Sequence, residues 1–109
     1  MTNVEKMRKT YHVKEETYVK IMDLMDEVRE ALKAGKEYDL FLFEKKMKKI
    51  VQPPIGDPEY DHHMVEDVAK AFLLDERWEE VFLTLYKNEV SEKSFIEDWY
   101  AKKYGEPQK

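Results

Sequence analysis

The sequence predicts an all-α protein, a compact bundle of about five helices with a long N-terminal helix and no sheet. Three observations lead to this prediction. Apolar residues recur at the three- and four-residue spacing of one helix face in five separate segments. Most of these segments begin or end at a residue suited to cap a helix. The loops between them are roughly two to six residues long, as in helical bundles.

Composition indicates a single folded domain over residues 1–109. Of the 109 residues, 42% are hydrophobic, which is too many for a disordered chain although 39% are charged. The chain has no cysteine, which excludes disulfides and thiolate chemistry. No segment resembles a signal peptide or approaches the ~18 apolar residues of a membrane span, so we expect a cytoplasmic protein with no membrane partner.

The formal net charge is −5, which favours solubility and makes nucleic acid an unlikely main partner. Sixteen lysines and sixteen glutamates accompany only four asparagines and glutamines together. This enrichment is typical of hyperthermophile proteins. It is equally typical of a helix-rich chain, because lysine and glutamate are good helix formers.

The longest apolar rhythm runs from Val4 to Leu32, with members about 3.5 residues apart. It favours a long helix packed in coiled-coil fashion, with its ordered part over residues 14–34 and frayed ends at 1–12. The segment 33–35 supplies a stop, with a lysine in the last turn and a glycine for a left-handed cap.

A second helix is expected over residues 39–51. Asp39 suits its N-cap, and Tyr38 and Phe43 have the spacing that closes a hydrophobic contact over the first turn. The apolar run 40–43 also fits a short buried strand, but no partner strand is visible elsewhere in the sequence.

The centre of the chain carries two apolar stripes that predict the core. Prolines 53 and 54 end the second helix, and Asp57-Pro58 begins a third over 58–74. The stripes are out of phase, because continuing the first would place charged residues in the core. We therefore expect Asp75 to cap a new helix over 76–88. The first stripe is Val65, Val68, Ala69, Phe72 and Leu73; the second is Trp78, Val81, Phe82, Leu85 and Tyr86.

A last helix is expected over residues 91–104. Ser91 is its predicted N-cap, Val90 and Phe95 have the spacing of a hydrophobic contact over the first turn, and Gly105 ends it. Trp99 is predicted to lie in the core with the phenylalanines of the central stripes. Residues 106–109 are expected to be a loose tail.

Catalytic chemistry is not expected. The chain has only three glycines and no phosphate-binding loop. Neighbouring carboxylates such as Glu79 and Glu80 splay apart on a helix instead of converging. We therefore predict a non-enzymatic protein without a cofactor.

One group of side chains has the spacing of metal ligands. These side chains are Glu59, His62, His63 and Glu66, followed by Asp67. Glu59 and His62 are spaced as in di-iron helical bundles, but such sites need two of these motifs and two more glutamates. An acidic first turn beside surface histidines is the favoured interpretation, because this spacing is common in helices.

The sequence has one basic cluster, which consists of Lys45, Lys46, Lys48 and Lys49. Lysines in such a run can neutralise phosphates of DNA or RNA. No nucleic-acid-binding motif accompanies them, so a solvated face opposite an apolar stripe is the favoured interpretation.

An apolar surface in excess of what one core needs predicts protein–protein binding. The predicted interface residues are Tyr18, Ile21, Met25, Val28, Leu32 and Phe41. We expect an adaptor, regulator or inhibitor, for instance of the phage type, that binds a protein partner or forms a homodimer across this seam. Nucleic-acid binding through the lysines and metal binding through the histidine cluster are the alternatives.

Overall fold

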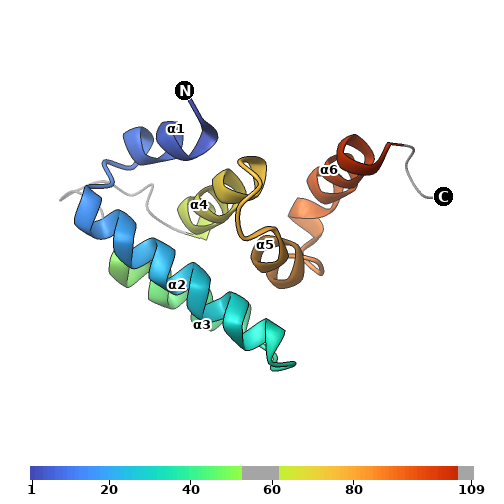
Figure 1. Ribbon diagram of the computed structural model, residues 1–109, viewed down its shortest axis with the longest axis horizontal. Coiled ribbons are helices and arrows are strands. Elements are labelled where there is room, and N and C mark those ends of the chain that lie inside the picture. The colour runs from blue at the N-terminus through green and yellow to red at the C-terminus, as the bar shows by residue number, and fades with distance from the viewer. Residues whose placement is uncertain (53–61, 106–109) are drawn as a thin grey trace.

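The computed structural model describes residues 1–52 and 62–105, which are all-helical and contain no strand (Figure 1). The all-α prediction is therefore confirmed for these residues, whereas the long N-terminal helix is not, because the first helix is short. The helices are α1 (Asn3–Thr10), α2 (Glu15–Lys33), α3 (Leu40–Ile50), α4 (His62–Leu74), α5 (Glu79–Leu85), the 3₁₀ helix η1 (Val90–Glu92) and α6 (Lys93–Tyr104).

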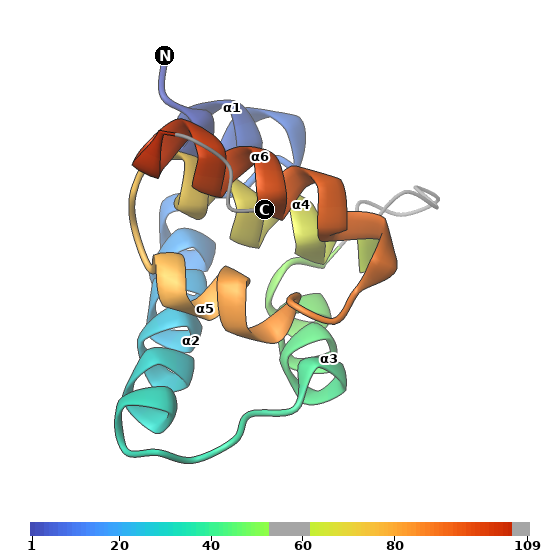
Figure 2. The same cartoon turned by 90° about the vertical axis from the view of Figure 1, so that its right-hand side faces the viewer.

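The helix pair α2–α3 forms an antiparallel hairpin along one side of the molecule (Figures 1 and 2). Helix α4 packs against α3, and α1 packs on α4. Helix α5 contacts both α4 and α2, so the core lies between the hairpin and this central pair. Helix α6 lies at the far end from α1 and is joined to the rest through η1 (Figure 1).

The predicted core stripes are largely confirmed. Every member of the first stripe is buried, as are all members of the second except Trp78, which is half-buried. Trp99 packs against the core but is only half-buried, so the prediction that it lies inside the core was wrong. The reason is that α6 lies at the edge of the molecule and buries none of its residues completely.

Residues 3–10 form a helix of their own where the sequence predicted a frayed end. The Thr2 hydroxyl accepts a hydrogen bond from the Glu5 N–H at 3.0 Å and caps this helix. His12 adopts φ 54°, and the Val13 N–H donates to the Arg8 carbonyl at 2.8 Å, which closes the helix and turns the chain back. The predicted long helix is divided at this point, where a histidine occupies the position that glycine usually takes.

Asp75 does not cap the helix that follows it in the sequence. It ends α4, and its carboxylate caps α1 instead. The oxygens accept from the Asn3 N–H at 3.1 Å and the Val4 N–H at 2.8 Å. Burial alone would raise the pKa of Asp75, but hydrogen bonds from Val4, Asn3 and Thr2 outweigh it and lower the pKa. A carboxylate at the positive end of a helix is stabilising, so Asp75 ties the N-terminus to α4.

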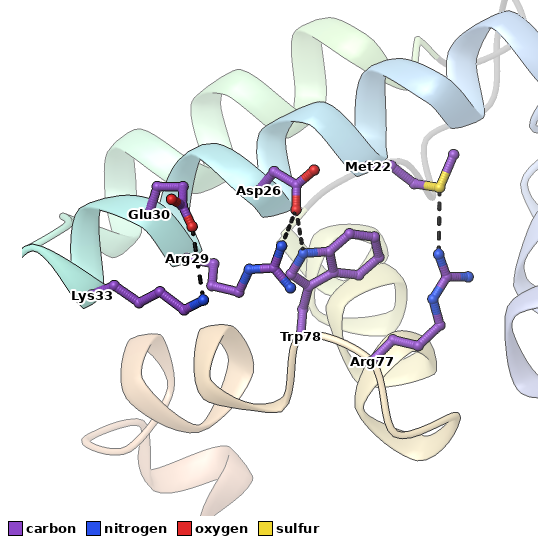
Figure 3. Close-up of polar contacts among 7 residues, drawn as sticks. All are labelled: Met22, Asp26, Arg29, Glu30, Lys33, Arg77 and Trp78. Carbon is purple, nitrogen blue, oxygen red and sulfur yellow. Dashed lines mark hydrogen bonds and ion pairs between the residues drawn. The ribbon is translucent and has the colours of Figure 1, made fainter.

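Helix α5 begins three residues later than predicted, because the chain before it adopts unusual backbone angles. Glu76 and Trp78 have φ of 60° and 49°. Trp78 is held by its indole N–H, which donates to Asp26 at 2.8 Å, while Arg29 bonds to the same carboxylate oxygen at 2.7 Å (Figure 3). The Arg77 guanidinium lies 4.8 Å from the Trp78 ring centroid. These contacts offset the strain of the left-handed backbone.

The remaining helix boundaries are partly confirmed. Asp39 caps α3 by accepting from the Phe41 N–H at 3.2 Å, so the strand alternative for residues 40–43 was wrong. Gly105 ends α6 with φ 87°, as predicted. Ser91 lies inside η1 instead of capping a helix, and Val90 is 88% exposed, so the predicted cap and hydrophobic contact were wrong, although helical structure begins at Val90, one residue before the predicted start. The predicted helix start at Asp57-Pro58 lies outside the described residues.

Candidate interaction surface

The predicted interface seam on α2 lies inside the molecule. Ile21, Met25 and Val28 are fully buried, while Tyr18 and Leu32 are half-buried. Helices α3 and α5 of the same chain pack against α2. The seam is therefore unavailable to a second copy, because its apolar residues already pack within the chain.

Phe41 is the predicted interface residue that remains exposed, with 72% of its surface accessible. It belongs to α3, where Asp39 starts the helix and the buried stripe faces α2 and α4. Phe41 lies at the opposite face, one and two helical turns before Lys45, Lys48 and Lys49. These four residues and Glu44 line a shallow hollow of about 400 Å³.

We call the exposed part of this region the α3 outer face and define it as Phe41, Lys45, Lys48 and Lys49. The structure thus brings together residues that the sequence had assigned to two different sites. This face combines an exposed aromatic ring with three exposed cations. Its local positive charge contrasts with the net charge of the whole chain, which is −5. The face is suited to a partner that offers an apolar recess and negative charge.

Lys46 belongs to a different environment from the other three lysines. Its ammonium bonds to the Glu27 carboxylate at 2.7 Å, and the Tyr38 hydroxyl donates to the same oxygen at 2.6 Å. Hydrogen bonds from Lys46 and Tyr38 lower the pKa of Glu27. Lys46 therefore joins α3 to α2, and its predicted role in phosphate binding does not fit this ion pair.

The predicted metal cluster is described only in part. Glu59 and the side chain of His62 lie outside the described residues. His63 is exposed and its Nδ1 atom lies 3.9 Å from the Glu66 carboxylate. Within residues 1–52 and 63–105, no group of three or more potential ligands is arranged to hold a metal ion. Metal binding by this cluster therefore stays an untested alternative, and surface histidines beside an acidic turn stay the prediction.

Glu66 points into the protein instead of joining a surface cluster. Glu66 on α4 and Glu92 on η1 are 8% and 4% exposed, and their carboxyl groups are close enough to influence one another's ionisation. The Lys70 ammonium bonds to Glu92 at 2.8 Å. Burial, with the nearby Glu92 carboxyl, raises the pKa of Glu66 to about 7. Protonated Glu66 can donate to Glu92, which fastens η1 to α4.

This carboxyl pair predicts a pH-dependent stability. Because the pKa of Glu66 in the folded protein, about 7, exceeds its ordinary 4.5, its contribution is complete below pH 4.5 and is lost as the pH rises through 7. We expect the free energy of unfolding to fall over this range, by at most about 1.4 kcal/mol per pH unit. Denaturant titrations at several pH values measure it.

The Glu66→Gln variant provides the comparison. Its amide can still donate to Glu92 without carrying a charge, so we expect it to be more stable than wild type at pH 8 and to have a flatter profile. The control is Glu80→Gln, which removes an exposed carboxyl and should keep the wild-type profile. If stability changes with pH in the same way in wild type and in Glu66→Gln, the raised pKa of Glu66 in the folded protein is contradicted.

Sequence reasoning missed Glu66 and Glu92 as a buried pair. Glu66 lies next to the core residue Val65, and Glu92 follows Ser91, the predicted cap. A glutamate beside an apolar stripe is usually solvated, so nothing in the spacing indicated that two acidic side chains from separate helices meet.

Comparison of the chain with protein-family models, curated proteins and solved structures finds no match in any of the three. Among the described helices, none is long and apolar enough to cross a membrane.

Proposed function

We propose that this chain is a non-enzymatic protein-binding module that uses the α3 outer face to bind an acidic segment of another protein. The observation that supports the proposal most directly is the exposure of Phe41, at 72%, on the rim of a hollow lined by lysines. A large aromatic ring on a rigid helix loses little entropy on binding, and such rings often dominate the binding energy.

The positive charge of the α3 outer face predicts that the partner is acidic. Lys45, Lys48 and Lys49 are exposed and form no ion pair within the part of the chain that is described. Lysines on the rim of an interface attract acidic partners and accelerate association, with an effect that weakens as salt rises. The partner segment is therefore expected to combine an apolar residue that packs on Phe41 with neighbouring aspartates or glutamates.

The proposal is tested by selection of binders from a randomised peptide library. Peptides that bind the wild type should be enriched in acidic residues around an apolar one. Phe41→Ala should weaken the selected peptides about 30-fold, which corresponds to about 2 kcal/mol for the loss of an aromatic anchor. Fluorescence anisotropy of labelled peptides measures the affinities, and circular dichroism checks that the variants remain folded.

Charge reversal tests whether binding depends on the lysines of this face or on the overall charge of the chain. Lys45→Glu, Lys48→Glu and Lys49→Glu together should abolish binding. A matched variant reverses three exposed lysines on other elements, Lys6, Lys36 and Lys87, and should bind nearly as well as wild type. Equal losses in the two variants would contradict a specific role for the α3 outer face.

Nucleic acid is the second candidate, because the same three lysines can contact phosphates. Labelled single- and double-stranded DNA and RNA are measured beside the peptides at physiological salt. Tighter binding to nucleic acid, with a steep salt dependence and no effect of Phe41→Ala, would overturn the proposal in favour of that function.

A further inference from the structure

Helix α6 buries none of its residues completely, and its two sides have different properties. Phe95, Ile96 and Trp99 are half-buried toward the rest of the molecule, and the Phe95 ring meets the Phe82 ring edge-on at 5.7 Å. Tyr100 and Tyr104 are 46% and 68% exposed on another side. Figures 1 and 2 show α6 along the outside of the molecule, away from the α2–α3 hairpin.

The exposed side carries a regular row of four residues, which we call the α6 row: Lys93, Glu97, Tyr100 and Tyr104. They follow one another at spacings of four, three and four residues, which is the spacing of a helix–helix seam. The two tyrosine rings stack with centroids 6.0 Å apart and form one continuous aromatic surface. Within the described residues, Lys93 and Glu97 form no ion pair or hydrogen bond through their side chains.

The order of residues in the α6 row is self-complementary in one orientation. In an antiparallel pair of α6 helices, Lys93 faces Tyr104 of the second copy, and Glu97 faces its Tyr100. An ammonium over a tyrosine ring is attractive, and a tyrosine hydroxyl can donate to a carboxylate. The same helix already places the Lys103 ammonium 4.9 Å from the Trp99 ring centroid. A parallel pair would instead oppose lysine to lysine and glutamate to glutamate, which repel.

We propose that a second copy of this chain covers the α6 row, in a two-fold dimer whose α6 helices run antiparallel. Two-fold symmetry makes each Lys93–Tyr104 and Glu97–Tyr100 contact occur twice. This dimer replaces the one expected through α2, whose seam is buried within the chain. It leaves the α3 outer face free, so it does not rest on the binding function proposed above.

The dimer is expected to be weak, since one helix per copy forms the contact. Interfaces that bury less than about 1,200 Å² in total are typical of transient complexes. Sedimentation velocity from about 10 µM to about 1 mM spans the dissociation constants of such complexes. We expect the weight-average mass of the wild type to rise from monomer toward dimer across this range, and a monomer at every concentration would overturn the proposal.

A pair of variants tests which surface forms the contact. Tyr100→Glu places a carboxylate opposite Glu97 of the second copy and should keep the chain monomeric at concentrations where wild type associates. Its thermal midpoint should stay close to that of the wild type, because Tyr100 is exposed. Phe41→Glu alters an exposed aromatic residue on α3 and should leave the dimer unchanged. Loss of the dimer in Phe41→Glu alone would overturn the assignment to α6.

The absence of cysteine from the chain allows the orientation to be measured by disulfide trapping. Lys93→Cys and Tyr104→Cys are prepared separately, mixed and oxidised. In the antiparallel pair, position 93 faces position 104, so the mixed disulfide should dominate. Two copies of residue 93 would lie about 16 Å apart along the axis, too far for a disulfide. Dominant 93–93 and 104–104 disulfides would indicate a parallel pair and overturn the proposal.

Discussion

Replacing Phe82 by alanine is expected to lower the free energy of unfolding by about 3–5 kcal/mol, the range for truncating a buried aromatic side chain. Phe82 is fully buried on α5. Its ring stacks on Tyr86 with centroids 4.7 Å apart and meets Phe95 of α6 edge-on. The substitution therefore leaves a cavity and also removes the surface on which α6 packs.

Denaturant unfolding followed by circular dichroism measures this loss. Phe41→Ala is the matched control, because it truncates the same side chain where it is exposed, and it should change stability by less than about 0.5 kcal/mol. If Phe82→Ala costs less than about 1 kcal/mol, Phe82 is not in the core and the packing of α5 is misplaced.

Replacing Asp75 by alanine is expected to lower the free energy of unfolding by about 2–3 kcal/mol and to detach α1 from α4. The carboxylate accepts from two backbone N–H groups of α1 and from the Asn3 amide at 2.9 Å. Hydrogen bonds to a charged group each contribute more than neutral ones, and their loss leaves the donors at the start of α1 unsatisfied. Hydrogen exchange should show that the amides of α1 lose protection more than those of α2.

Thr2→Ala is the control for Asp75→Ala. It removes the local cap of the same helix and one hydroxyl donor to Asp75, but leaves the donors of Asn3 and Val4 in place, so it should lower the free energy of unfolding by only about 1 kcal/mol. Because the pKa of Asp75 is lowered in the folded protein, its contribution is present near neutral pH and is lost as the pH falls through that pKa. The difference in the free energy of unfolding between wild type and Asp75→Ala should therefore become smaller at acidic pH. A loss no larger than that of Thr2→Ala would contradict the tie between α4 and α1.

Local signals predicted several elements correctly. The 3.6-residue rhythm located the apolar stripes of α4 and α5, and the Asp39 cap and the Gly35 and Gly105 stops marked helix ends. These features depend on neighbours within a few residues, so the sequence contains what is needed to recognise them. The separation of α1 from α2 was missed, because His12 adopts a left-handed conformation that the sequence gives no reason to expect.

The candidate surface was predicted only in its parts. Phe41 and the lysines were identified separately, because the sequence does not say which side of α3 is covered by α2. The same limitation led to the seam around Met25 being assigned to a dimer, although the chain buries it itself. An amphipathic stripe indicates that a face will be covered, but the covering element is chosen by the packing of all the helices.

The helical class, the two apolar stripes of the core, the Asp39 cap and the glycine stops follow from the amino-acid sequence alone. The fold was needed to show that Asp75 caps a helix 71 residues away, that Glu66 lies beside Glu92, and that Lys46 pairs with Glu27 while Lys45, Lys48 and Lys49 remain exposed. The difference arises because periodicity and capping act within one or two turns of a helix. Charges and hydrogen-bonding groups, in contrast, find partners through the folded arrangement, which the spacing of residues along the chain does not specify.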